Sequence, residues 1–133
     1  MALTVGKLAS AAGVGVETIR FYEKRGLITQ PVRRTSGYRE YSDSDVVRLQ
    51  FIKRAQGLGF TLKEIGELIQ LEQDSRARCS DLQDRTEEKI RAVDEKLAEL
   101  ARMRSELVKL ARSCAPDAPL AECQLMNCLA GRC

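Results

Sequence analysis

Hydrophobic and polar positions alternate at helical spacing over most of the chain, and short glycine-containing breaks separate the helical stretches. In the first stretch the apolar positions form one face, made by Val5, Leu8, Ala9 and Ala12. Gly13 and Gly15 then indicate a turn, and apolar residues resume from Val16 until Gly26. This pattern predicts two short helices joined by a tight turn, which is typical of a helix-turn-helix.

Two further helices are predicted after residue 41, each opened by a capping box. Ser42 is followed three residues later by Asp45, and Thr61 is followed three residues later by Glu64. The expected core positions recur every three or four residues: Val46, Leu49, Ile52 and Ala55 in the first helix, then Leu62, Ile65, Leu68 and Ile69 in the second. Between the two helices, Gly57 and Gly59 predict a break.

Between these helical pairs lies the segment "RRTSGYREY", residues 33–41. Its Ser36-Gly37 pair indicates a turn, and basic and aromatic residues flank that turn. The segment therefore predicts a small hairpin, or wing, whose arms are short enough to need packing against the helices.

A long helix is predicted over residues 80–112, with Ser80 and Gln83 as a third capping pair. Its apolar residues follow heptad spacing, and Arg104 takes the one missing position: Ile90, Val93, Leu97, Leu100 and Leu107. This seam is typical of a two-stranded coiled coil, and so of a homodimer. The alternative is that the helix packs on its own domain, but its other faces are charged.

Composition and charge narrow the class of protein. The 133 residues allow one compact domain, or a small domain with an extension. Residues 1–41 carry seven Lys or Arg and three Glu, a net charge of +4, whereas the remainder carries −1. An anionic partner is therefore expected for the first part only. No signal peptide or membrane span is visible, so we expect a cytoplasmic protein in which cysteines serve metal or redox chemistry rather than a disulfide framework.

The basic first part predicts binding to double-stranded DNA. We expect the second helix to lie in a major groove, with Thr18, Arg20 and Tyr22 near bases or phosphates. In the wing, Arg34, Tyr38 and Arg39 are expected to clamp the backbone. The plainer interpretation of these arginines is a solvated basic face. We expect Phe21 to lie in the core.

The stretches "TVGKLASAAGVGVETIRFYEKRGL" and "SGYREYSDSDVVRLQFIKRAQGLGFTLKEI" resemble the MerR family of transcription regulators over nearly the whole chain. The resemblance implies a mainly α fold: a winged helix-turn-helix domain (residues 1–71), a linker and antiparallel coiled-coil dimerisation helix (72–112), and a C-terminal metal-binding loop and tail (113–133). It also implies a homodimer that binds promoter DNA and distorts it, so that RNA polymerase can use a badly spaced promoter.

Three cysteines lie near the ends of the predicted long helix. Cys79 precedes it, where the positive helix end favours a thiolate, and Cys114 and Cys123 follow it on a loop containing Pro116 and Pro119. A helix of that length spans about 50 Å, so Cys79 and Cys114 can meet only between two antiparallel chains. This arrangement resembles the metal-sensing branch of the family, and its mercury sensors most closely. Hg²⁺ is the expected effector, with Pb²⁺, Cd²⁺ and Zn²⁺ as alternatives.

Cys128 and Cys133 lie outside this group of three, and two other classes of function are alternatives to metal sensing. Cys128 and Cys133 could add a fourth ligand, capture metal at the surface, or have no role. A redox or electrophile sensor on the same scaffold is the second hypothesis. An enzyme is disfavoured, because the chain has no His, no Cys-x-x-Cys and no nucleotide-binding glycine loop.

Overall fold

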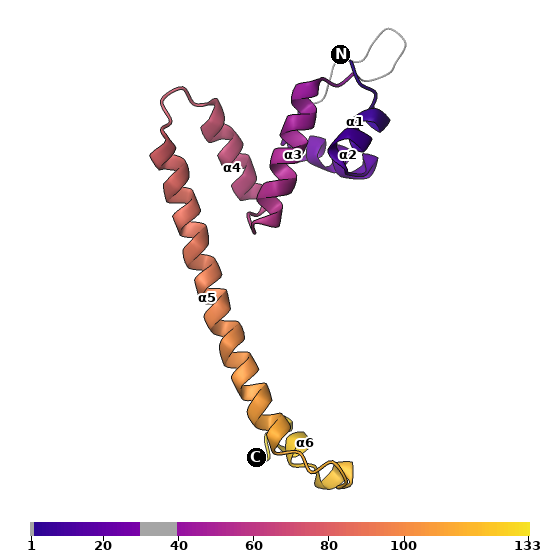
Figure 1. The fold of residues 1–133 in the computed structure, drawn as a ribbon, viewed down its shortest axis with the longest axis vertical. Coiled ribbons are helices and arrows are strands. Elements are labelled where there is room, and N and C mark those ends of the chain that lie inside the picture. The colour runs from indigo at the N-terminus through magenta and orange to yellow at the C-terminus, as the bar shows by residue number, and fades with distance from the viewer. Residues whose placement is uncertain (1, 30–39) are drawn as a thin grey trace. The chain divides into compact units, whose positions relative to one another are not determined.

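The computed structural model describes residues 2–29 and 40–133, and its regular structure there is helical (Figure 1). The elements follow in the order α1 (Val5–Ala12), α2 (Val16–Lys24), α3 (Asp43–Gly57), α4 (Leu62–Gln73), α5 (Cys79–Arg112), the short 3₁₀ helix η1 (Leu120–Glu122) and α6 (Gln124–Leu129). The predicted mainly α fold is confirmed. Two compact units, Met1–Arg85 and Thr86–Cys133, divide within α5. Most of the predicted hairpin, residues 33–41, falls in residues 30–39 and so lies outside the described residues. Its last residue, Tyr41, forms an antiparallel bridge with Leu3 through backbone hydrogen bonds of 2.7 and 2.8 Å.

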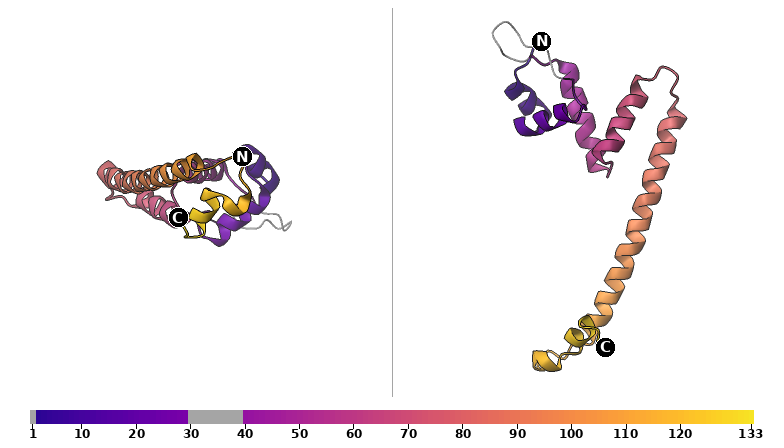
Figure 2. Two further views of the ribbon diagram at one scale, coloured as in Figure 1. Left: turned by 90° about the horizontal axis from the view of Figure 1, so that it is seen from below. Right: turned by 180° about the vertical axis from the view of Figure 1, so that it is seen from behind.

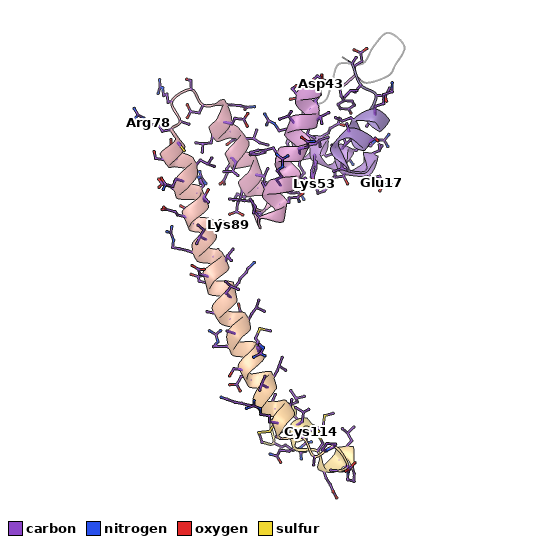
Figure 3. The ribbon with its side chains drawn as sticks, viewed as in Figure 1. Glu17, Asp43, Lys53, Arg78, Lys89 and Cys114 are labelled. Carbon is purple, nitrogen blue, oxygen red and sulfur yellow. A yellow bond between two sulfur atoms is a disulfide. The ribbon has the colours of Figure 1, made fainter. Side chains whose placement is uncertain are left out.

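The helix-turn-helix of α1 and α2 forms as the glycine pattern predicts. Thr4 caps α1 by accepting a 3.2 Å hydrogen bond from the Lys7 N–H. Gly13 ends the helix with φ +70°, a left-handed conformation that a residue with a Cβ adopts only at a cost. Lys53 of α3 reaches this turn and donates to the Gly13 carbonyl at 3.2 Å (Figure 3). The turn is thereby tied to the helix behind it.

Helices α3 and α4 open with the two predicted capping boxes. The Ser42 N–H donates to Asp45 Oδ2 at 2.9 Å, and the Thr61 N–H donates to Glu64 Oε1 at 2.8 Å. Both carboxylates thus satisfy backbone donors at a positive helix end. Gly59, with φ +92°, turns the chain between the two helices.

The core of the first unit is apolar and draws on α1 to α4. Among the described residues of this unit, the largest side chains that are almost completely buried are Leu8, Ile19, Tyr41, Leu49, Ile52 and Ile65. The carboxylate of Glu23 is buried with them. The Tyr41 hydroxyl donates a 2.8 Å hydrogen bond to Glu23 Oε1, which satisfies this buried acceptor. These contacts hold α2 by its inner side, which leaves its outer side available.

Helix α5 is one continuous helix of 34 residues. The two further views in Figure 2 show its ribbon without a break. It begins at Cys79, one residue earlier than predicted, and the expected Ser80–Gln83 capping pair is wrong. Asp81 instead accepts a 2.8 Å hydrogen bond from the Arg78 N–H, so Arg78 is the cap. No described residue of α5 is buried.

Candidate DNA-binding surface and metal-binding thiols

The outward face of α2 is charged and polar. Ile19 is fully buried on the inner side, whereas Arg20 and Lys24 are exposed and Thr18 is partly exposed. Glu17, in the first turn, is exposed as well (Figure 3). A helix held from behind with arginine and lysine on its free side has the form that enters a major groove.

Two adjacent aromatic residues of α2 exchange their predicted places. Phe21, expected in the core, is 44% exposed, and the Arg25 guanidinium carbon lies 5.1 Å from its ring centroid. This cation–π contact covers part of the exposed ring and orients Arg25 on the outer face. The prediction that Phe21 is a core residue is therefore wrong.

Tyr22, predicted as a DNA contact, is instead a core residue with only 6% exposure. Its hydroxyl donates a 2.6 Å hydrogen bond to Gln56 Oε1 of α3. Burial raises the pKa of the Tyr22 hydroxyl, because the phenolate would lose its hydration. Tyr22 therefore positions α2 on α3, and its assignment as a DNA contact is corrected. The predicted wing contacts, Arg34, Tyr38 and Arg39, lie outside the described residues and stay predictions.

Cys79 is a free, exposed thiol at the first residue of α5. It lies at the rim of a cavity of about 380 Å³ within the first unit. The lining is largely apolar and joins α3, α4 and the start of α5: Phe51, Leu68, Leu71, Glu72, Asp74, Ala77, Arg78, Cys79 and Leu82. The thiol thus borders both an apolar surface and the positive end of a long helix.

Cys114 and Cys123 are free thiols on the segment after α5. Cys114 lies directly beyond the end of the helix (Figure 3), and its N–H donates to the Ala111 carbonyl at 3.2 Å. Cys123 is partly exposed and joins η1 to α6, and its carbonyl accepts a 3.1 Å hydrogen bond from the Asn127 N–H. Sequence reasoning expected an irregular loop and tail here and missed both short helices.

The single chain does not bring the three thiols together. A helix of 34 residues rises about 50 Å, and Cys79 and Cys114 lie at its opposite ends. Among the described residues no group of three metal-ligating side chains converges. Three thiolates suit a soft ion by their chemistry, but their meeting requires a second chain.

The remaining cysteines form a disulfide, Cys128–Cys133, with the two Cα atoms 4.1 Å apart. The sequence left Cys128 and Cys133 with three possible roles, and a disulfide between them was not among those roles. The residue in the sequence that indicates this pairing is Gly131, which lies between the two cysteines. It follows α6 in the left-handed region, with φ +79°, and turns the chain back toward the helix.

Two family descriptions match this sequence, and together they cover residues 3–110. The description "MerR HTH family regulatory protein" matches residues 3–72, and "MerR, DNA binding" matches residues 46–110. The chain belongs to the MerR family. Its members are DNA-binding transcription regulators, which confirms that this MerR-family chain is not an enzyme.

Individual MerR-family relatives are similar over nearly the full length. The mercuric resistance operon regulatory protein of Shigella flexneri is 43% identical, over 97% of this chain and 88% of its own. PbrR691 from Ralstonia metallidurans CH34, solved with lead(II), has a TM-score of 0.87 at 33% identity and 96% and 98% coverage. MerR of Bacillus megaterium MB1, solved with mercury(II), has a TM-score of 0.76 at 38% identity and 96% and 99% coverage.

Within residues 2–29 and 40–133, none of the helices combines the length and apolar composition that crossing a bilayer needs.

Proposed function

We propose that the chain is a mercuric-ion-responsive MerR-family regulator that binds promoter DNA as a homodimer and activates transcription when the ion is bound. One observation carries the proposal. Free thiols stand at both ends of α5, and the helix between them exposes an unpaired apolar seam. Pairing two such helices antiparallel brings the thiols of opposite ends together.

The seam itself selects the register of the pair. Its six positions are symmetric about a point midway between Ala98 and Glu99: Ile90, Val93, Leu97, Leu100, Arg104 and Leu107. An antiparallel pair centred there sets Leu97 against the partner subunit's Leu100, and Ile90 against the partner subunit's Leu107. Every seam position then meets another seam position, and the five apolar ones are 42% to 61% exposed in the single chain.

The same register also determines which residues of the partner lie opposite Cys79. Counting outward from the centre, Cys79 falls opposite position 118 of the partner, which lies between Cys114 and Cys123 in the sequence. Each dimer would then hold two equivalent sites, each with Cys79 from one protomer and the other two thiols from its partner.

The donor set favours a soft ion. Three thiolates with no imidazole suit mercuric ion, whereas a structural zinc site usually has four ligands. Mercury also agrees with the name of the Shigella flexneri relative and with the ion bound to the Bacillus megaterium protein. Lead(II) is the second candidate, because it is the ion bound to PbrR691. Cadmium and zinc follow as alternatives.

The proposed DNA-binding element is α2, with Arg20 at base edges or phosphates and Thr18 at phosphates. The wing residues Arg34, Tyr38 and Arg39 are proposed to hold the adjacent backbone. As the family resemblance implies, the bound dimer would bend and undertwist the promoter so that RNA polymerase engages both of its elements. The proposed compartment is the cytoplasm, where promoter and polymerase are found.

Anaerobic titration of the reduced protein with Hg²⁺, Pb²⁺, Cd²⁺ and Zn²⁺ tests the effector. In a chain with Cys128 and Cys133 changed to Ser, which isolates the three-cysteine site, we expect ultraviolet charge-transfer bands with Hg²⁺ that are lost when Cys79→Ser, Cys114→Ser or Cys123→Ser is added. Retention of Pb²⁺ or Cd²⁺ over Hg²⁺ in competition would change the effector and keep the site. Absence of tight binding by all four ions would favour the redox-sensor hypothesis instead.

A further inference from the structure

The chain reverses direction after α6 through a hydrogen-bonded turn. The Arg132 N–H donates to the Asn127 carbonyl at 2.7 Å, and the Gly131 N–H donates to the Cys128 carbonyl at 3.1 Å. With Gly131 at φ +79°, these two bonds form a Schellman motif, the turn by which many helices end. The turn is therefore built from backbone bonds that do not involve sulfur.

This turn returns Cys133 to the side of Cys128. A second contact strengthens it, because Arg132 Nη2 donates to Asn127 Oδ1 at 3.2 Å. Gln124, one helical turn before Cys128, directs its amide Nε2 to Cys128 Sγ at 3.8 Å, as a weak donor to sulfur. These bonds hold Gly131 and Arg132 against the end of α6, and Cys133 follows Arg132 directly, so the two sulfurs stay neighbours when the disulfide is reduced.

We propose that the reduced Cys128–Cys133 pair is a second soft-metal site, separate from the three-cysteine site and independent of it. Two adjacent thiolates suit a thiophilic ion that accepts two sulfur ligands, such as mercuric ion. Binding releases the two thiol protons: two R–SH and Hg²⁺ give Hg(SR)₂ and two H⁺. Cys133 is exposed and Cys128 partly exposed, so an ion reaches the pair from solvent.

Oxidation closes this second site. In the disulfide, both sulfurs bond to each other and neither is a thiolate ligand. A small-molecule thiol reopens it by exchange: the protein disulfide and two R′–SH give two protein thiols and one R′–S–S–R′. The pair therefore binds metal only under reducing conditions, whereas Cys79, Cys114 and Cys123 are free thiols in the same structure.

The test uses the full chain with Cys79, Cys114 and Cys123 all changed to Ser, which removes the three-cysteine site. Hg²⁺ is titrated anaerobically into the reduced and the oxidised forms, in competition with a monothiol. We expect one ion per reduced chain, with two thiols protected from alkylation, and no tight binding to the oxidised form. Adding Cys128→Ser should abolish binding, while circular dichroism checks that the helices persist.

A second variant tests the turn rather than the thiols. In the same background, Gly131→Ala keeps both cysteines but adds a Cβ at a left-handed position. We expect Hg²⁺ affinity to fall about five- to thirtyfold, the usual cost of that conformation. Unchanged affinity, one ion shared by two chains, or no tight binding to the reduced form would each overturn the proposal.

Discussion

Substituting Leu97 by Gln tests the antiparallel seam near its centre. Leu97 is 59% exposed in the single chain, and the proposed dimer covers it. Fully burying a leucine is worth about 1.5–3 kcal/mol, so covering this fraction is worth roughly 0.9–1.8 kcal/mol per chain. Because a homodimer buries the residue twice, the loss is about 1.8–3.6 kcal/mol per dimer. The dimer dissociation constant should therefore rise about 20- to 370-fold.

The assay is sedimentation or light scattering over a dilution series, with the helix monitored by circular dichroism. Gln and Leu have similar helix propensities, so α5 should keep its helix content. Glu95→Gln is the matched control, since it introduces the same residue on the same helix away from the seam. If Leu97→Gln and Glu95→Gln dissociate within about threefold of each other, the reasoning from the heptad seam is refuted.

Three further predictions follow from the proposed site and the core. Cys79→Ser, Cys114→Ser and Cys123→Ser should each abolish mercury-dependent transcription but keep promoter binding, with Cys128→Ser as the control; full induction in any of the three would contradict the three-thiolate site. Arg20→Ala should weaken promoter binding about 5- to 150-fold without changing metal affinity, whereas Arg102→Ala on α5 should not, as measured by mobility shift at fixed salt. Burial raises the pKa of Tyr22 in the folded state, so its stabilising contribution is complete below about pH 10 and is lost as pH rises through the folded pKa. Between about pH 9 and pH 11, the free energy of unfolding should therefore fall less steeply with pH in Tyr22→Phe than in the unchanged chain. Equal slopes in the two proteins would contradict this.

Local signals in the sequence predicted most of the helical elements. The Ser42–Asp45 and Thr61–Glu64 boxes and the turn at Gly13 are confirmed, because each depends on residues within one or two helical turns. The start of α5 was misplaced by one residue because Ser80 and Asp81 are both plausible partners in a cap. Asp81 prevailed, since its carboxylate reaches the Arg78 N–H at 2.8 Å.

The places of Phe21 and Tyr22 could not be read locally. Neighbouring residues on a helix point about 100° apart, and the sequence around them does not say which direction faces the core. Packing against α3 decides it, because Gln56 accepts the Tyr22 hydroxyl and leaves Phe21 to Arg25. Gln56 is 34 residues away in the sequence, so no window along the chain contains the contact.

The sequence by itself determined helices α1 to α5, the turns between α1 and α2 and between α3 and α4, the apolar spacing along α5 and the presence of thiols at both of its ends. These features depend on backbone capping, glycine conformation and heptad spacing, which act over short distances. Only the tertiary structure decided which aromatic residue of α2 is buried, and that Cys133 lies against Cys128 while Cys79, Cys114 and Cys123 stay free. Burial and sulfur pairing depend on which segments meet in space, and residue order along the chain does not specify those meetings.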